Sequence, residues 1–188
     1  ELRVTAYRDF LTGLPNRILF QDHLTRAILR AKREQVFVAV LFIDLDRFKT
    51  VNDSAGHDAG DFVLREAGQR IAACIRCCDG VCRIGGDEFI VLLDCLSERQ
   101  TVMYIAERVL AAMAKPFVFH AEKFFVGASI GVSLFPLDGE DMETLVQNAD
   151  RAMYGVKRSG RNGWRFFHQQ ALPAQTENQC IGKPKRKM

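Results

Sequence analysis

The stretch VCRIGGDEFIVLL, residues 81–93, decides the fold because it sets two apolar runs on either side of paired glycines. Both runs have the length and the composition of short β-strands. Gly85 and Gly86 accept the positive φ angles that tight hairpin turns require. The stretch therefore predicts a β-hairpin that carries two acids, Asp87 and Glu88, at its tip.

The rest of the chain alternates between helical and strand patterns. Residues 36–43, VFVAVLFI, form a continuous apolar run, typical of a strand covered on both faces, which ends abruptly at Asp44. Helices are predicted over 16–33, 60–75, 97–115 (with Ser97 as cap) and 141–158; the other strands over 81–84, 89–93, 117–119, 124–127, 129–135 and 164–167. This order predicts an α+β fold, with helices flanking a central, mostly antiparallel sheet.

Composition fits one globular domain. The 188 residues are 48% hydrophobic and 26% charged, with a net charge of +3 that calls for no nucleic-acid partner. No apolar run approaches the ~20 residues of a membrane span, and no signal peptide is apparent. We expect a cytoplasmic domain over 1–168, without direct membrane contact, cut from a larger protein, membrane-bound or not. Residues 169–188 turn polar and predict a disordered tail.

The cysteines suggest a metal site only weakly. Cys74, Cys77 and Cys78 fall at spacings that would share a helix face. No His stands at a finger-like distance from them, and Cys82 and Cys95 lie in apolar runs where a thiol packs as a small hydrophobe. We therefore expect reduced thiols without a structural role for zinc.

Two pairs of acids stand where carboxylates are costly. Asp44 and Asp46 follow the buried strand, and Asp87 and Glu88 occupy the hairpin tip. Carboxylates crowded around an apolar sheet repel one another unless a cation neutralises them, and oxygen ligands favour Mg²⁺ or Mn²⁺. Ordinary turn-forming acids would give the same pattern, so the residues alone leave both interpretations open.

Two further features could bind phosphate. Residues 48–61 are rich in amides, acids and glycines, and predict a turn whose backbone N–H groups face an anion or, alternatively, a solvated loop. Lys157 and Arg161 stand four residues apart and could point at one anion, although surface charges often show this spacing. No GxxxxGK[ST] stretch is present, which excludes a P-loop.

The segment Gly85-Gly86-Asp87-Glu88-Phe89 is the GGDEF signature, and its surroundings resemble the diguanylate cyclase family. The matching blocks are DFLTGLPNR at 9–17, DLDRFK at 44–49 with ND at 52–53, GH at 56–57, GD at 60–61, and residues 154–162. The match covers about residues 5–167. It implies a palm-like or ferredoxin-like nucleotide-cyclase fold that condenses two GTP into cyclic di-GMP and two pyrophosphates between the two subunits of a homodimer.

The resemblance also implies metal and catalytic residues. Asp44 and Asp87 would bind Mg²⁺ or Mn²⁺ together with the Leu45 carbonyl, and Glu88 would accept a proton or hold a second metal ion.

Substrate contacts follow from the same resemblance. Asn52 and Asp61 would hydrogen-bond the guanine edge, which adenine could not match without leaving polar groups unpaired. The phosphates would be held by Lys157, Arg161 and the backbone amides around Arg47 and Phe48.

Arg76 and Asp79 form an RxxD motif that ends five residues before the signature. It is similar to the site at which the family binds its product, cyclic di-GMP, as a feedback inhibitor, and Arg108 on the next predicted helix is a further candidate. The plain alternative is a surface ion pair at i, i+3.

Two other functions remain possible. A catalytically silent module would bind GTP or cyclic di-GMP and regulate a linked domain, but such a module is expected to lose Asp44, Asp87 or Glu88, and all three are present. A dimerisation piece of a bifunctional protein is suggested by residues 165–167, RFF, which resemble the stretch leading into a linked phosphodiesterase domain. In each case an upstream sensory domain is an expected partner.

Overall fold

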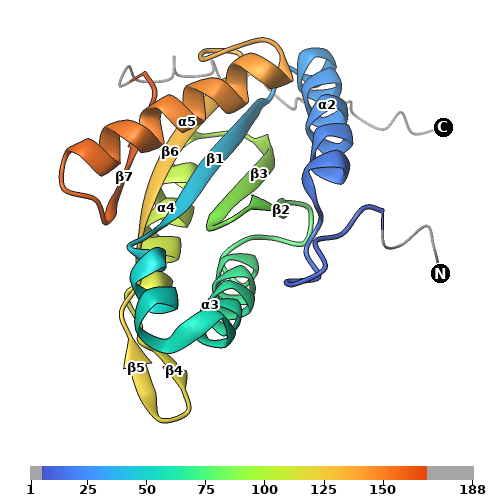
Figure 1. Cartoon of the computed structure of the whole chain (residues 1–188). Helices are drawn as coiled ribbons and strands as arrows, with labels where there is room; N and C mark the ends of the chain where they lie inside the picture. The colour runs from blue at the N-terminus through green and yellow to red at the C-terminus, as the bar shows by residue number, and fades with distance from the viewer. Residues whose placement is uncertain (1–5, 169–188) are drawn as a thin grey trace, which may run out of the picture.

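The structure is a computed structural model and describes residues 6–168. Its centre is a five-stranded sheet in the order β2-β3-β1-β6-β7 (Figure 1). The strands are β1 (Phe37–Asp46), β2 (Gly80–Gly85), β3 (Glu88–Leu96), β6 (Gly127–Phe135) and β7 (Gly163–Phe166). All neighbours are antiparallel except β6 and β7, which run parallel. A separate ribbon pairs β4 (Phe117–Phe119) with β5 (Glu122–Phe124).

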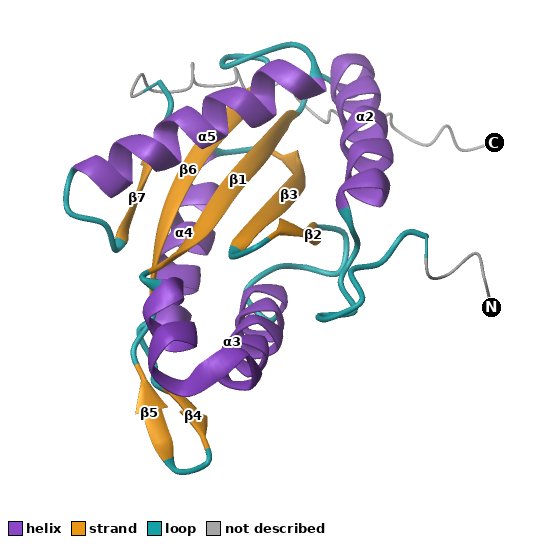
Figure 2. Cartoon of the chain, in the orientation of Figure 1, coloured by secondary structure: helices purple, strands orange, loops and turns teal. Residues whose placement is uncertain are grey.

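Helices cover both faces of the sheet (Figure 2). They are α2 (Arg17–Glu34), α3 (Phe48–Ala72), α4 (Arg99–Met113) and α5 (Met142–Arg158). One buried cluster joins α3 and α4 to the sheet, and the other joins α2 and α5 to the opposite face. The succession β1-α3-β2-β3-α4-β6 is the ferredoxin-like order, to which α5 and β7 are added at one edge. The predicted α+β fold with a mostly antiparallel sheet is confirmed.

Strand β1 is buried on both faces, as its apolar run predicts. Leu41 and Ile43 face α3 and α4, whereas Val40 and Phe42 face α2 and α5. The expected end at Asp44 is wrong, because β6 continues to pair with β1 as far as Asp46. Since side chains alternate along a strand, positions 44 and 46 share the face that α5 covers.

Small residues on β6 allow α5 to lie close against the sheet. A Cβ on Gly131 would overlap the backbone of α5 at the Ala149 carbonyl oxygen and the Met153 nitrogen. The Ser133 hydroxyl donates to the Leu145 carbonyl at 2.7 Å. Asp141 caps the helix by accepting from the Thr144 N–H at 2.9 Å. These contacts fix the direction of α5 and so direct its last turn to the end of β1.

Helix α3 corrects two predictions. It begins at Phe48 and ends at Ala72, so the region expected to be a turn is largely helical and the helix is shorter at its C-terminal end than predicted. Phe48 and Val51 are buried three residues apart, which anchors the first turn despite its polar neighbours. Gly56, with φ of 80°, interrupts the helix and divides it into two arms.

Other boundaries differ by a few residues. Helix α4 is shorter than expected, and its N-cap is Glu98, which makes no side-chain capping bond, so the prediction of Ser97 as the cap is wrong. The strand expected over 124–127 is replaced by β5, which ends at Phe124, and by β6, which begins at Gly127. The prediction for the first helix is confirmed, with Asn16 accepting from the Ile18 and Leu19 N–H groups as its N-cap.

The segment before α2, residues 8–15, forms a closed turn that we call the leader turn. Its ends are joined by an isolated bridge between Arg8 and Pro15. Leu14 packs against α3 at Gly68. The Arg83 N–H donates to the Pro15 carbonyl at 3.2 Å, so the leader turn lies along the outer edge of β2.

The cysteines of the described region are free thiols. Cys82 is buried, which raises its pKa to about 12. Helix α3 ends before Cys74, so no helix face joins that residue to the exposed Cys77 and Cys78, and Cys95 is exposed rather than packed. Cys180 and the tail predicted over 169–188 lie outside the described residues. Within 6–168, no helix has the length and apolar character of a membrane span.

Candidate active site

The acids singled out in the sequence meet where the C-terminal end of β1 lies beside the start of β3, at one end of the central strands of the sheet. Asp44 and Glu88 are paired across β1 and β3. The Leu45 N–H donates to the Asp87 carbonyl at 3.2 Å, which holds the hairpin tip beside the end of β1. The sheet itself therefore brings together all three predicted catalytic acids.

Lys157, in the last turn of α5, reaches this acid group. Its Nζ lies 2.6 Å from Oδ2 of Asp44, a side chain that is 8% exposed. Burial raises the pKa of Asp44; the Lys157 ammonium opposes this rise, while Asp87 and Asp46 add to it. A single ammonium therefore does not fully offset the cost of a charge at Asp44.

The negative charge of Glu88 has even less cationic compensation than that of Asp44. Burial raises the pKa of Glu88 first, and the charges of Asp44, Asp87 and Asp150 raise it further, opposed by Lys157. A groove of about 510 Å³ between α2, α5 and the sheet is lined by both Glu88 and Asp150. The site thus has an excess of negative charge, which a bound cation would relieve.

The donor set fits a divalent cation that arrives with its ligand. Among residues 6–168, no group of three or more His, Cys, Asp or Glu side chains is arranged to hold a metal ion. Mg²⁺ in proteins commonly takes one or two carboxylates and completes its shell with water and substrate phosphates. Asp44 and Asp87, which repel each other at the end of β1, would provide this kind of partial shell.

The kink in α3 brings together the two residues predicted to bind guanine. Asn52 belongs to the first arm and Asp61 to the second. A Cβ on Gly60 would overlap the side-chain oxygen of Asn52, so Asn52 lies against the residue next to Asp61. Both side chains are partly exposed, which leaves a carboxylate and an amide available to an external ligand.

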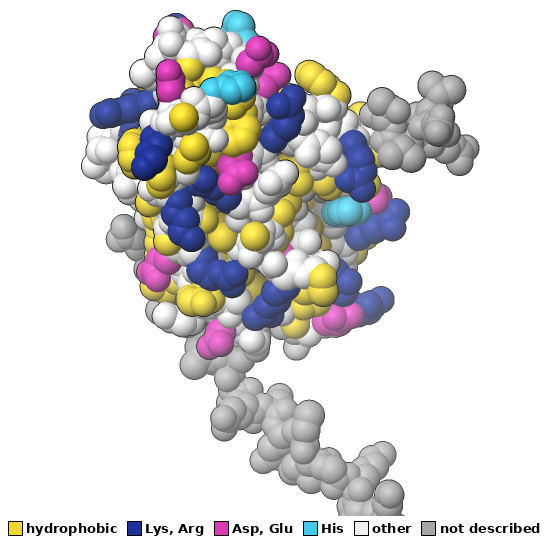
Figure 3. Space-filling model, turned by 90° about the horizontal axis from the view of Figure 1, so that it is seen from below, with side chains coloured by type: hydrophobic (Ala, Val, Ile, Leu, Met, Phe, Trp, Pro, Cys, Tyr) yellow, Lys and Arg dark blue, Asp and Glu magenta, His cyan; other side chains and the backbone are white. Residues whose placement is uncertain are grey.

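The phosphate contacts stay a prediction, but the structure places two of the expected residues, Arg47 and Arg161, around one hollow. Arg47 has a left-handed backbone (φ of 60°) just before α3 begins at Phe48. The N–H groups at the start of a helix have no partner one turn earlier, although the Thr50 N–H donates to the Arg47 carbonyl at 2.9 Å. Arg47 and Arg161 line a common hollow of about 320 Å³. Lys and Arg side chains are also scattered over the face seen from below (Figure 3).

The two cations Lys157 and Arg161 do not belong to one helix. Helix α5 ends at Arg158, so Lys157 and Arg161 are not helical i, i+4 neighbours. Lys157 instead contacts Asp44, and Arg161 lies in the turn that follows the helix with φ of 65°.

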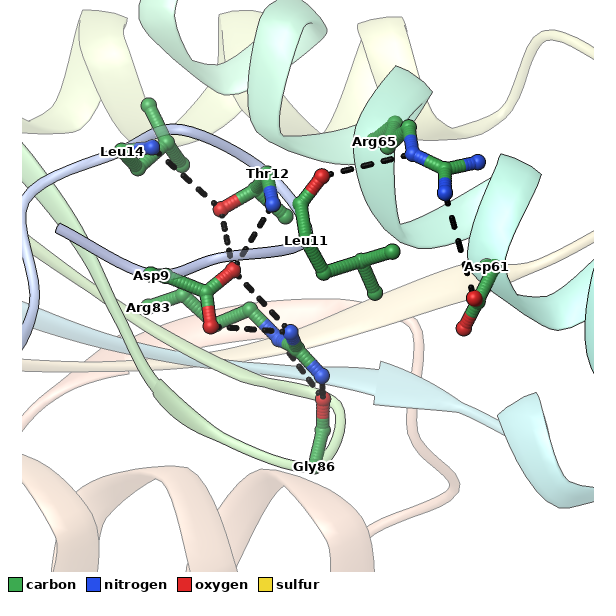
Figure 4. Close-up of polar contacts among 8 residues, drawn as sticks. All are labelled: Asp9, Leu11, Thr12, Leu14, Asp61, Arg65, Arg83 and Gly86. Atoms are coloured by element: carbon green, nitrogen blue, oxygen red, sulfur yellow. Dashed lines mark hydrogen bonds and ion pairs between the residues drawn. The ribbon is translucent and has the colours of Figure 1, made fainter. Parts of the chain in front are cut away.

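Arg83 connects the signature hairpin to the leader turn, a role that the sequence analysis did not assign (Figure 4). Its guanidinium lies 3.1 Å from each carboxylate oxygen of Asp9 and donates twice to the Gly86 carbonyl, at 3.0 and 2.8 Å. Burial on its own raises the pKa of Asp9, but hydrogen bonds from Thr12 and the contact with Arg83 outweigh it and lower the pKa. The available signal in the sequence was a single charged residue, Arg83, within the short apolar run that precedes the paired glycines.

Figure 4 also shows how the leader turn approaches the second arm of α3. Arg65 donates to the Leu11 carbonyl at 3.3 Å, and its guanidinium lies 3.9 Å from Oδ2 of Asp61. The candidate guanine residue Asp61 is thus held near the leader turn by a partly exposed ion pair.

The RxxD residues lie at the opposite end of β2 from the signature, about 20 Å away for a six-residue strand. The Asp79 carboxylate bonds to the backbone, accepting from the Arg76 N–H at 3.0 Å and the Asp94 N–H at 3.2 Å. Burial raises the pKa of Asp79, and the hydrogen bond from the Arg76 N–H and the charge of Arg76 partly oppose the rise. Arg76 is exposed, and Arg108 donates to the Ala73 carbonyl at 3.2 Å. The alternative of a simple Arg76–Asp79 ion pair does not describe this turn.

Comparisons with known proteins agree on one family. The model described as "Diguanylate cyclase, GGDEF domain" matches residues 6–163. The chain is 44% identical to the bifunctional diguanylate cyclase/cyclic di-GMP phosphodiesterase MucR of Pseudomonas aeruginosa, over 89% of this chain and 24% of MucR. It is 41% identical to the cyclic di-GMP phosphodiesterase NbdA of the same organism, over 94% of this chain and 22% of NbdA.

A solved structure extends the agreement to three dimensions. The GGDEF domain of TpbB from Pseudomonas aeruginosa is similar with a TM-score of 0.84 at 40% identity, over 86% of this chain and 94% of that one. The chain therefore aligns with most of the TpbB GGDEF domain, whereas it spans about a quarter of the length of MucR and NbdA.

Proposed function

The chain belongs to the GGDEF family of diguanylate cyclase domains, and from this membership we propose that it condenses two GTP molecules into cyclic di-GMP and two pyrophosphates. The observation that carries the proposal is the meeting of Asp44, Asp87 and Glu88 at one sheet edge, with Lys157 beside Asp44. The raised pKa values of Asp44 and Glu88, beside the ammonium of Lys157, suit a ligand that combines a divalent cation with phosphates.

The proposed reaction is an in-line displacement at phosphorus. The 3′-oxygen of one GTP forms a bond to the α-phosphorus of the other, the bond to pyrophosphate breaks, and the same exchange in the opposite sense closes the ring. Glu88 is the candidate acceptor of the hydroxyl proton. A bound Mg²⁺ or Mn²⁺ would supply charge stabilisation on the phosphoryl oxygens. Asp44 and Asp87, with the Leu45 carbonyl, would hold that ion.

Binding of the remaining parts of GTP falls to the other predicted residues. Asn52 and Asp61 would pair with the guanine edge, where adenine would leave their polar groups unpaired. The phosphates would contact Lys157, Arg161 and the free backbone N–H groups at Arg47 and Phe48. Lys157 would then exchange part of its contact with Asp44 for phosphate oxygens when the metal ion binds that carboxylate.

Ring closure requires two GTP molecules that face each other, which we assign to two copies of the domain in a homodimer. The rate per molecule should therefore rise with protein concentration until the dimer saturates. In the larger protein, we infer a cytoplasmic location and an upstream sensory domain that controls this encounter. Arg76 and Asp79 would bind the product and inhibit further turnover.

The decisive experiment incubates the purified domain at high concentration with GTP and Mg²⁺ and follows pyrophosphate and nucleotide products by chromatography. Cyclic di-GMP is the expected product, and Asp87→Ala should abolish it while leaving the circular dichroism spectrum unchanged. Turnover that survives in Asp87→Ala would contradict the assignment of the metal site.

A second candidate is a regulatory module that binds nucleotide without turnover. It is favoured by the similarity to NbdA, which is named as a phosphodiesterase although it contains a matching segment. GTP or cyclic di-GMP that binds tightly without any product, across a wide range of protein concentration, would select this candidate.

A further inference from the structure

The turn after α5 has an unusual backbone. Gly160, Arg161 and Asn162 are consecutive and all have positive φ, at 117°, 65° and 47°. Left-handed backbone is unfavourable for a residue with a side chain, so the two non-glycine residues need compensating contacts. The conformation matters because Arg161 is a candidate phosphate ligand and its direction depends on this turn.

Two hydrogen bonds hold the turn. The Arg161 N–H donates to the Val156 carbonyl at 3.1 Å, which ties the turn to its own helix. The Asn162 N–H donates to Oδ2 of Asp46 at 2.9 Å, which ties it to the end of β1. Of the two, only the second fixes the turn relative to the sheet edge that carries the acid group.

Both carboxylate oxygens of Asp46 accept hydrogen bonds within the protein. Asp46 is 5% exposed, and its second oxygen, Oδ1, accepts from the Ser129 hydroxyl at 2.7 Å. Gly127 opposes Asp46 across β1 and β6, and a Cβ there would lie 3.3 Å from Oδ2 of Asp46 and 3.0 Å from Oδ1 of Asn162. The glycine therefore leaves the space in which the carboxylate and the turn meet.

We propose that Asp46 is a positioning residue that fixes the 160–162 turn through the Asn162 N–H and thereby holds Arg161 at the phosphate end of the site. Its neighbour on the same strand face, Asp44, contacts the ammonium of Lys157 and belongs to the acid group. The two acids, two residues apart, thus have different tasks. The role of Arg161 rests on the proposed function, whereas the fixing of the turn does not.

The hydrogen bonds distinguish this task from that of a metal ligand. An Asn at position 46 could accept from the Asn162 N–H through its oxygen, and its amide could donate to Ser129, because a hydroxyl both donates and accepts. Asp46→Asn should therefore keep the turn in place, whereas Asp46→Ala removes both bonds. A metal ligand would show the opposite sensitivity, since loss of the charge would be damaging in either variant.

The first test needs no nucleotide. Hydrogen exchange followed by mass spectrometry, on a peptide containing residues 160–163, should be about tenfold faster in Asp46→Ala than in the natural chain, and nearly unchanged in Asp46→Asn. Ser129→Ala, which removes only the second bond of Asp46, should have a small effect. Unchanged exchange in Asp46→Ala would overturn the proposal whatever the activity of the domain.

The second test uses turnover with GTP and Mg²⁺. Asp46→Ala should raise KM about tenfold with a smaller change in kcat, and Asp46→Asn should restore most of the affinity. In an Arg161→Ala background, Asp46→Ala should add little, because the two residues act through one contact. Additive effects, or an Asp46→Asn variant as poor as Asp46→Ala, would overturn the link to Arg161.

A failure of the proposed function would look different. If the natural chain makes no cyclic di-GMP, the same set of variants is compared by calorimetric binding of GTP with Mg²⁺, and the exchange experiment is unaffected. Natural affinity in Asp46→Ala would then refute the role at the phosphate end.

Discussion

At the residue scale, three acids at one sheet edge differ in their surroundings rather than in their chemistry. Asp44 has a lysine beside it and a raised pKa, Asp46 has both oxygens bonded within the fold, and Glu88 faces mainly other carboxylates. The partners of Asp46 lie 83 and 116 residues further along the chain. A local pattern of two aspartates at i and i+2 cannot distinguish these environments.

The raised pKa of Glu88 predicts a stability effect in the absence of divalent cations. The folded state favours the neutral acid, so the stability that comes from this group is present at low pH and is lost as pH rises through the raised pKa. Glu88→Gln should therefore stabilise the domain at pH 7 by about 0.5 kcal/mol, a small figure because water screens part of the repulsion at this partly exposed side chain.

Urea unfolding in EDTA tests this expectation at pH 7 and again near pH 4. The gain from Glu88→Gln should shrink at the lower pH, and added Mg²⁺ should shrink it at pH 7. Glu107→Gln, at an exposed position on α4, serves as the control with little effect. Destabilisation by Glu88→Gln at neutral pH would contradict the repulsion inferred at the hairpin tip.

At the element scale, Arg83 joins the leader turn to the hairpin. Arg83→Ala should cost about 2 kcal/mol of unfolding free energy, because it leaves a half-buried Asp9 without its cation and the Gly86 carbonyl without two donors. Urea unfolding measures the loss, and Arg65→Ala, which removes a more exposed guanidinium, should cost less than 1 kcal/mol, as is typical of surface contacts. Equal losses in the two variants would show that the link carries no special stability.

The close contact between β6 and α5 gives another prediction at this scale. Gly131→Ala should cost about 3 kcal/mol or more, because its Cβ would overlap backbone atoms that cannot rotate away. Gly80→Ala is the matched control, since its Cβ would meet only Leu92 Cβ at an ordinary 3.8 Å. Thermal unfolding compares the two, and a Gly131→Ala variant as stable as the control would mean that α5 can move away from the sheet.

The elements that the sequence predicts well are those with a strong apolar pattern. The run over 36–43 and the hairpin around Gly85 and Gly86 need no distant information, and Asn16 marks the start of α2. Helix α3 was missed in part because Phe48 and Val51 are isolated apolar positions in a polar segment. The acids of the candidate site were identifiable by type, but the contacts of Arg83 with Asp9 depend on tertiary pairing across 74 residues.

At the scale of the whole molecule, β2 links the proposed active site to the proposed inhibitory site. The signature lies at one end of this strand, and Arg76 and Asp79 lie just before the other. A ligand at the second site would therefore be too far from the first to compete directly with substrate, and inhibition would have to act through the strand or through contacts between domains.

Arg76→Ala tests this second site. The variant should relieve inhibition by cyclic di-GMP at least about tenfold, because an exposed guanidinium suited to phosphate and guanine is removed, while the initial rate stays the same. Progress curves with added cyclic di-GMP measure the effect. Asp79 is less suited to the test, since its carboxylate also bonds to the backbone of β3. Unchanged inhibition in Arg76→Ala would place product binding elsewhere.

The leader turn has a consequence for solubility. Strand β2 is the outermost strand on its side of the sheet, and the leader turn satisfies one of its outward N–H groups through the Pro15 carbonyl. An uncovered strand edge is a template for pairing with another chain. A fragment trimmed to begin at α2 would therefore present an open edge, and its molecules would tend to join strand to strand into aggregates. The leader turn before α2 therefore helps to prevent aggregation through the open edge of β2.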